Sequence, residues 1–179
     1  FRQIEKNNEH NPQLAAEAAY QLSKLAEDSI RYTAGLEHAE KALRLIPDNA
    51  TYLNAAGFFS DKLAQYKKAI SYYEQALTIL RIQYPEKHPD IAAVKNDLGM
   101  AWDALGEYQK AIAFFEQALE SLIDHYGENH PDVAAIQNNI GMAWDSLGDY
   151  PRAIRYYEQS LEADRNHLGE DHPSIAKRR

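Results

Sequence analysis

Residues 88–129 read HPDIAAVKNDLGMAWDALGEYQKAIAFFEQALESLIDHYGEN, and the chain begins the same pattern again at residue 130. The dipeptide His-Pro recurs every 42 residues, at positions 88, 130 and 172. Trp102 returns as Trp144 and Gly106 as Gly148, with the same spacing. A fixed period of this size indicates a stacked array of one supersecondary unit.

The composition limits the class of partner. The 179 residues carry a formal net charge of −8, with a sequence pI near 5.3. Nucleic acid and anionic membranes both require a basic patch on the protein, so we expect neither as a partner. Cysteine is absent, which excludes disulfides and thiolate chemistry and suits the cytoplasm. No apolar run approaches the roughly 18 residues of a membrane-spanning helix.

The period predicts four helix pairs in a single solenoid domain over residues 1–179. Their expected bounds are about 12–49, 50–91, 92–133 and 134–175, with residues 176–179 as the truncated start of a further unit. Residues 1–11 are polar, which predicts a frayed lead-in. The first residue is Phe1 and not methionine, so we expect a fragment of a longer protein. Apolar residues nowhere alternate with period two, so no strand is expected.

Local signals mark where the helices begin and end. Pro89 suits a first helical position, and the acidic residue after it favours the positive end of the helix dipole. Gly106 is expected to end that helix, and the second helix of the pair should begin near Glu107 and end at Gly127. In the first pair, residues 32–35 are expected to carry the turn and the start of the second helix. One helical stripe of apolar residues is expected to pack in the third pair, at Ala111, Ile112, Phe115, Ala118, Leu119 and Leu122.

The third and fourth units resemble a known family. Leu98-Gly99, Trp102, Ala111, Phe115 and Ala118 have the spacing of a tetratricopeptide repeat, and the following unit repeats that spacing. The 42-residue length, the His-Pro-Asp start and the polar pair before the Leu resemble the repeats of kinesin light chains and their bacterial relatives. The resemblance implies a right-handed α-solenoid whose concave groove binds peptides. It does not imply kinesin itself, because such repeats occur in many unrelated proteins.

The first helix of the third unit has two distinct faces. At 100° per residue, Leu98 lies at the centre of an apolar face about 120° wide. The opposite side carries Asn96, Met100 and Asp103, and in the family that it resembles this side lines the groove. Moving by 42 residues in each direction extends these positions to a candidate partner-binding groove of three rows: Asn54, Asn96, Asn138; Phe58, Met100, Met142; and Asp61, Asp103, Asp145.

Two interpretations of these rows stay open. A mid-helix Asn costs roughly 0.6 kcal/mol against Ala, and an Asp in the last turn faces the negative end of the helix dipole at about 0.3–1 kcal/mol. Three of each on one face favour contact with a ligand, and the alternative is a face that is only solvated. Phe58 and the two methionines are core residues instead if the helices are rotated differently.

The charge of this groove favours one class of ligand. Peptide-binding members of the family often carry Lys or Arg in the groove and bind acidic motifs. Here the groove is predicted to be acidic, with Lys24 and Lys62 set against a larger group of carboxylates: Glu17, Glu27, Asp28, Asp61, Asp103 and Asp145. We therefore expect a basic or neutral protein or peptide as partner.

Catalytic, cofactor and metal sites are not predicted. His88, His130 and His172 lie one whole unit apart, and adjacent packed helices are already separated by about 8–10 Å. They cannot share one ion with bonds of about 2 Å, so we interpret each as a residue at a helix start. The chain contains no nucleophile elbow, phosphate loop or metal motif, and we do not expect an enzyme.

The sequence thus predicts an all-α protein- or peptide-binding scaffold, used to recruit a partner as part of a larger protein. Stacked units would offer a rigid wall that loses little entropy on binding. Two alternatives remain. The units could self-assemble through exposed end faces of the solenoid, or they could form the sensor or recruitment region of a larger signalling enzyme.

Overall fold

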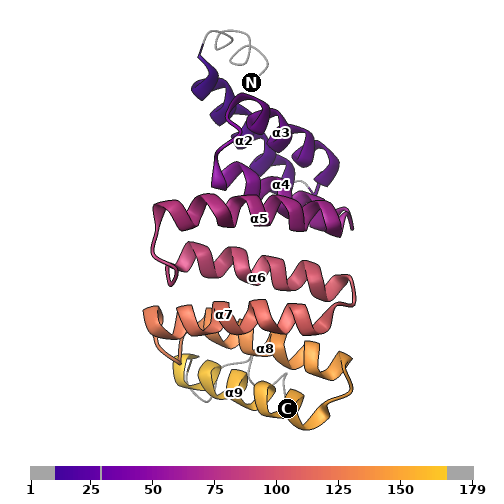
Figure 1. The fold of residues 1–179 in the computed structure, drawn as a ribbon, viewed down its shortest axis with the longest axis vertical. Helices are drawn as coiled ribbons and strands as arrows, with labels where there is room; N and C mark the ends of the chain where they lie inside the picture. Colours follow the sequence, from indigo (N-terminus) through magenta and orange to yellow (C-terminus); the bar gives the residue numbers. More distant parts are fainter. Residues whose placement is uncertain (1–10, 29, 169–179) are drawn as a thin grey trace. The chain divides into compact units, whose positions relative to one another are not determined.

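The computed structural model describes residues 11–28 and 30–168. Within these residues the chain forms eight helices and no strand, which confirms the all-α repeat solenoid (Figure 1). Two compact halves are distinguished, Phe1–Gln83 and Tyr84–Arg179, and each contains two helix pairs. The single domain expected over residues 1–179 stays a prediction, and the start of a further unit lies outside the described residues.

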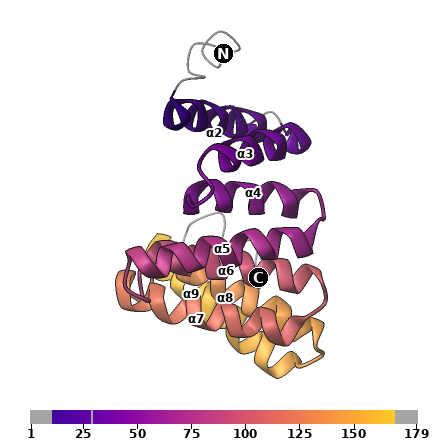
Figure 2. The same ribbon diagram turned by 45° about the horizontal axis from the view of Figure 1, so that its top comes forward.

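The N-terminal half contains the first two helix pairs. Helices α2 (Pro12–Asp28) and α3 (Tyr32–Leu45) form one pair, and α4 (Ala50–Lys62) and α5 (Tyr66–Gln83) form the other. Each helix packs on the next in chain order, and Figure 2 shows α3 beside both α2 and α4. The side-chain oxygen of Asn49 caps α4 by accepting a hydrogen bond from the Tyr52 backbone nitrogen at 3.0 Å.

The C-terminal half contains the two pairs with the strongest repeat. They are α6 (Pro89–Ala104) with α7 (Tyr108–Tyr126), and α8 (Pro131–Ser146) with α9 (Tyr150–Leu168). Here too each helix packs on the next, and α6 also touches α8. The first helices of neighbouring pairs are therefore in direct contact in this half, which is the arrangement that a groove along first helices requires.

The His-Pro-Asp sequence forms the start of α6 and of α8 in the same way. Nδ1 of His88 accepts a hydrogen bond from the backbone nitrogen of Asp90 at 3.2 Å, and the His130 cap has the same length. The His88 ring also stacks on Tyr84, with 4.0 Å between ring centroids. The interpretation of these histidines as helix-start residues is confirmed for both, while His172 lies outside the described residues.

The turns within helix pairs use left-handed backbone. Gly106 and Gly148 have φ of +79° and +77°, and Gly127 ends α7 with φ of +82°, so the predicted helix ends of the third unit are confirmed. The α4–α5 turn has Ala64 at φ +56° in the corresponding place. An alanine there bears the strain of its Cβ, which glycine avoids.

The predicted start of the second helix within residues 32–35 is confirmed, but the prediction that these residues also carry the turn is wrong. Tyr32 already opens α3, and the turn lies in the residues before it, where Ile30 has φ of +54°. Gly35 is buried inside the helix. Its lack of a side chain serves packing, because a Cβ at this position would lie 2.4 Å from the Phe59 ring.

The core of the C-terminal half lies between α6, α7 and α8. Leu98 and Ile140 are completely buried, and Trp102 and Trp144 pack against this core from its edge. The glycine that follows Leu98 is required by close packing, because a Cβ on Gly99 would lie 2.4 Å from the Phe115 ring. Gly141, which follows Ile140, faces the Tyr157 ring in the same way. The glycine lets the second helix of the pair approach closely, which explains why the motif recurs.

Candidate first-helix binding surface

The predicted groove positions of α6 lie on one exposed stripe. The Asn96 side-chain nitrogen donates a hydrogen bond to the Met100 sulfur at 3.6 Å, and Met100 is 38% exposed. Asp103 follows one turn later and is partly buried. These three side chains are therefore on the same side of α6, away from Leu98.

Helix α8 repeats the stripe with more exposure. Asn138 donates to the Met142 sulfur at 3.4 Å, and Met142 is 49% exposed. Asp145 is exposed. Neither methionine of the predicted groove is a core residue, so the alternative of a different helix rotation is excluded for α6 and α8.

Helix α4 differs from the other two. Phe58 is only partly exposed and packs against the core formed by α3 and α4, with its ring edge-on to Phe59 at 5.2 Å. The Lys62 nitrogen lies 5.2 Å from the Phe58 ring centroid. Asn54 and Asp61 are half-buried beside it. In this pair the apolar row serves the fold as well as the surface.

Burial shifts the acid–base equilibrium of two groove carboxyls. Burial alone raises the pKa of Asp103, whose Oδ1 is buried without a hydrogen-bond partner. Burial also raises the pKa of Asp61, and the positive charge of Lys62 partly opposes this shift. A buried carboxylate oxygen without a donor is costly, so the fold destabilises the ionised form of Asp103.

The Asn row does not have a uniform role. Asn139 Nδ2 donates to Asn96 Oδ1 at 3.1 Å, which links α8 to α6. Asn96 thus combines a structural contact between helices with its place on the surface. Asn138 has no such contact and is directed to the Met142 side.

A pocket of about 370 Å³ opens between α6, α7 and α8. Its apolar walls are Ala93, Leu122, Tyr126, Ala135 and Ile136. Its polar lining consists of Asp90, Asn96, Asp97, Asp132 and Asn139. Only Asn96 of the predicted groove residues lines it. The sequence pattern indicates only a helix-stabilising role for Asp90 and does not single out Asp132, Asn139 or Tyr126 as site residues, because nothing in the repeat shows that residues about 42 apart share one cavity.

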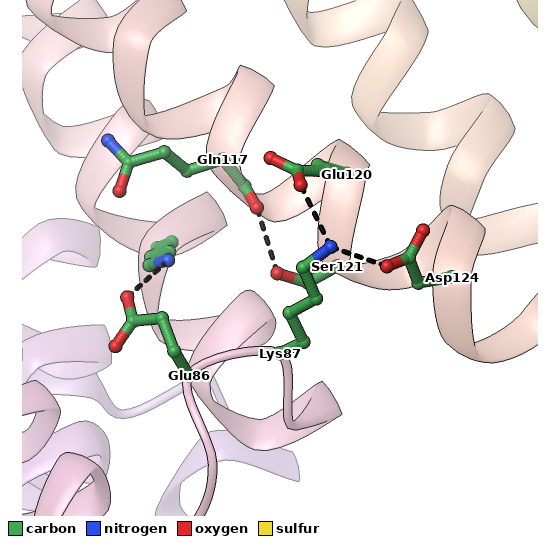
Figure 3. A network of polar contacts seen from close by, with 7 residues as sticks. Glu86, Lys87, Gln117, Glu120, Ser121 and Asp124 are labelled. Carbon is green, nitrogen blue, oxygen red and sulfur yellow. Dashed lines mark hydrogen bonds and ion pairs between the residues drawn. The ribbon is translucent and has the colours of Figure 1, made fainter.

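A network of ion pairs connects the loop before α6 to α6 and α7. Lys87 Nζ lies 2.5 Å from Asp124 Oδ2 and 2.9 Å from Glu120 Oε1, and both carboxylates belong to α7 (Figure 3). The bonds to Asp124 and then Glu120 raise the pKa of Lys87. Lys95 of α6 is only 3% exposed and pairs with Glu86 at 2.8 Å. Both lysines are therefore already paired with carboxylates of the fold: Lys95 is buried, whereas Lys87 stays about half exposed.

The repeated tryptophans pack as expected and each carries a cation on its ring. Lys110 Nζ lies 4.3 Å from the Trp102 ring centroid, and Arg152 Cζ lies 3.8 Å from that of Trp144. These pairs join the two helices of one pair across their turn. In the part of the chain that is described, no group of three or more His, Cys, Asp or Glu side chains could hold a metal ion.

The helix pairs and the Gly–aromatic contacts define a helical-repeat protein. The tetratricopeptide repeat profile matches residues 48–124 and 105–166, more than half of the chain. The chain belongs to the tetratricopeptide repeat family. No curated protein sequence matches it significantly.

Solved structures share the fold at low sequence identity. BtubC (BKLC) from P. vanneervenii has a TM-score of 0.80 at 23% identity, over 99% of this chain and 75% of that one. Kinesin light chain TPR-like repeats from Podosopora anserina have a TM-score of 0.79 at 19% identity, covering 94% and 83%. MamA from Desulfovibrio magneticus RS-1 has a TM-score of 0.74 at 18% identity, covering 94% and 82%.

The fold has general consequences for function. Tetratricopeptide repeats are generally non-enzymatic scaffolds for protein–protein interaction, and the likeness to kinesin light chain repeats fits the 42-residue period. None of the helices in residues 11–28 and 30–168 is long and apolar enough to cross a membrane.

Proposed function

We propose that this chain recruits a protein partner by binding an extended peptide across its first helices, and that basic or neutral peptides are preferred over acidic ones. In the C-terminal half the proposed contact residues are those of the three predicted rows on α6 and α8, and in the N-terminal half they are the residues of the same rows on α4. We extend the proposal to a cytoplasmic protein that binds neither nucleic acid nor membrane, because the net charge is −8 and cysteine is absent. These repeats act as the recruiting part of a larger protein.

The observation that carries the proposal is the state of Asp103. Its carboxyl is partly buried, one oxygen has no hydrogen-bond partner, and its pKa is raised by burial. Perturbed carboxyls of this kind are concentrated at binding sites. Asp103 as a whole is only partly buried, so a peptide cation placed at its exposed part would favour the ionised carboxylate, and the exposed Met100 beside it would cover the ligand's apolar atoms.

The hydrogen bonds of the groove residues indicate a different role for each of them in binding a peptide. Asn138 offers its carbonyl oxygen to a peptide backbone, since only its nitrogen is engaged, by a weak bond to sulfur. Met100 and Met142 present flexible, polarisable side chains that adapt to varied partners. Asn96 contributes less, because Asn139 already occupies its oxygen.

Titration of a peptide array graded by net charge tests the proposal. Basic and neutral peptides should bind, and acidic peptides should be excluded, with the preference weakening as salt screens charges beyond about 8 Å. Met100→Ala should change the rank order of ligands, whereas Asn138→Ala should weaken all of them about 2- to 10-fold, as expected for one lost hydrogen bond. A preference for acidic peptides contradicts the proposal.

Self-assembly is a second candidate, favoured by the surface of α9. Ile154 of α9 is 56% exposed, whereas Ile112 at the same repeat position of α7 is 5% exposed under α8. Ile154 also lines a pocket of about 360 Å³ with Tyr157 and Leu161. Sedimentation velocity at several concentrations decides between the candidates: association that Ile154→Asp abolishes supports assembly, and a concentration-independent monomer excludes it.

A further inference from the structure

We propose that the pocket between α6, α7 and α8 binds the guanidinium group of one arginine side chain of the partner. This assignment rests on the peptide-binding function proposed above and gives it a specific anchoring position. The pocket measures about 370 Å³, which lies within the range of about 300–1,000 Å³ for ligand sites in proteins.

Hydrogen-bond acceptors dominate the polar lining. The carboxylates of Asp90 and Asp132 are 60% and 65% exposed, and no Lys, Arg or His lines the pocket. Each Asp lies 3.6–3.7 Å from a histidine Nδ1 that accepts a hydrogen bond from the backbone nitrogen of that same Asp, so this nitrogen does not donate to the carboxylate. The two carboxylates therefore meet solvent and not a cation.

An amide supplies a third acceptor that is independent of the carboxylates. Asn139 Nδ2 donates a hydrogen bond to Asn96 Oδ1 at 3.1 Å, and the side-chain carbonyl oxygen of Asn139 can then accept one from a ligand. The same bond fixes the Asn139 side chain between α6 and α8. A ligand with several N–H donors in one plane matches this combination, and the guanidinium group has five.

The remaining lining distinguishes arginine from other cations. The described carboxylates are not grouped to hold a metal ion, so an organic cation fits better. The apolar walls suit the methylene stem of a long side chain. The Tyr126 ring also lines the pocket and is 44% exposed, although one of its faces stacks on His130, with 4.2 Å between ring centroids. Guanidinium stacks on aromatic rings and binds carboxylates through two bonds, which ammonium cannot do.

A pocket in the N-terminal half serves as a comparison, because its acidic lining residue is already bound by other residues of the protein. It measures about 300 Å³ and contains both Glu40 and Arg44. Glu40 is already bound by Lys68 at 2.7 Å and by the Tyr72 hydroxyl at 3.0 Å. The contrast indicates that the acceptor excess of the α6–α8 pocket is specific to that site.

The experiment uses two pentapeptides, acetyl-Ala-Ala-Arg-Ala-Ala-amide and the same peptide with citrulline, which is neutral and nearly isosteric. Chemical-shift titration of the whole chain should give about tenfold tighter binding of the arginine peptide, with the largest shifts at Asn139 and Tyr126. A lysine peptide should bind between the two. Equal affinity for arginine and citrulline overturns the proposal.

Two variants and one control localise the effect. Asp132→Asn should reduce the arginine-to-citrulline ratio towards one, and Ala135→Leu should block both peptides by filling the pocket. Glu162→Gln removes the same charge from exposed α9, outside the pocket, and should leave the ratio unchanged. Equal effects of Asp132→Asn and Glu162→Gln would mean general electrostatic attraction and would overturn the site.

The outcome separates this inference from the proposed function. If array peptides bind but Asp132→Asn and Ala135→Leu leave their ranking unchanged, the arginine pocket is wrong and peptide recruitment stands. If no array peptide binds the wild-type chain, both fall. Melting curves of the variants show whether the fold is retained, which is expected because Asp132 and Ala135 are exposed.

Discussion

The α4–α5 pair and the α8–α9 pair are equivalent units of the repeat, but they have different side chains at the repeated aromatic position and in the turn between the helices. In α8–α9, the position of the repeated aromatic is Trp144, under the Arg152 guanidinium, and the turn has Gly148. In α4–α5 the same positions are Ser60, completely buried, and Ala64 at φ +56°. Both pairs nevertheless form two packed helices.

A basic residue in the first turn of each second helix makes different contacts in the different pairs. Lys68, Lys110 and Arg152 share one repeat position. Without a tryptophan to cover, Lys68 pairs with Glu40 of α3 at 2.7 Å and lies 5.9 Å from the Tyr72 ring centroid. Lys110 and Arg152 instead lie on indole rings of their own pair, and their ion pairs, with Glu107 and Asp149, are to residues three positions earlier in the chain. The repeat therefore specifies a helix geometry, and each pair reaches it through its own contacts.

An exchange of side-chain size links α3 and α4. Phe59 stands where α6 and α8 have Ala101 and Ala143, and Gly35 stands where α5 and α7 have Ala69 and Ala111. The ring of Phe59 fills the space that a side chain on Gly35 would need. A large residue on one helix is offset by a missing one on its neighbour, so volume is conserved at the contact.

This exchange predicts the largest effect. Phe59→Ala should cost about 3–5 kcal/mol of unfolding free energy, because the ring is 1% exposed. Gly35→Ala should cost about 1–3 kcal/mol, since the clash with the ring exceeds the gain in helix propensity. In the Phe59→Ala background, Gly35→Ala should become stabilising by up to about 1 kcal/mol. Urea unfolding of this double-mutant cycle measures the coupling, and simple additivity would refute the exchange.

The turns should respond in opposite directions. Ala64→Gly removes a Cβ from left-handed backbone, which is worth about 1–2 kcal/mol, and loses roughly 0.5–1 kcal/mol to chain entropy. A net stabilisation near 0.5–1 kcal/mol is expected, and Gly148→Ala should destabilise by a similar amount. Thermal melts compare the two, with Ala113→Gly, at an exposed position inside α7, as the control for a regular helix. The prediction is wrong if Ala64→Gly and Gly148→Ala both lower the melting temperature.

The shared cation position sharpens the comparison further. Arg152→Met and Lys110→Met should each cost about 0.5–1 kcal/mol through the lost cation–π contact. Lys68→Met should cost about 0.2–1 kcal/mol through a partly exposed ion pair. In 1 M salt, where the screening length is about 3 Å, the ion-pair part of each penalty should shrink, both for Lys68→Met and for the Arg152–Asp149 pair. The part of the Arg152→Met penalty that comes from the Trp144 ring should persist. Identical salt responses would contradict the assigned contacts.

The smallest effect concerns the groove carboxyl Asp103. Burial raises its folded pKa above the unfolded value of about 3.9, so the ionised form is disfavoured in the fold. The penalty is complete at pH 7 and disappears as pH falls through the folded pKa. Asp103→Asn should therefore raise the melting temperature at pH 7, with a gain that narrows near pH 4. The exposed Asp145→Asn serves as control, and a gain independent of pH would contradict the burial argument.

The candidate surface was only partly predictable from the chain. The stripe of Asn96, Met100 and Asp103 follows from a 3.6-residue period, and the structure places them on one face. The prediction that they bind a partner is untested. The pocket residues Asp132 and Asn139 could not be found this way, because their meeting with Asp90 and Asn96 depends on how α8 lies on α6.

Sequence alone determined that the chain is an all-α array of helix pairs with a 42-residue period, because spacing, glycine placement and His-Pro-Asp starts are local signals. It also determined the family, through the Leu-Gly, aromatic and Ala positions. Tertiary structure decided the role of Gly35, which depends on a ring 24 residues away. It likewise decided which polar atoms stay without a partner, since burial and hydrogen bonding arise only when neighbouring helices pack.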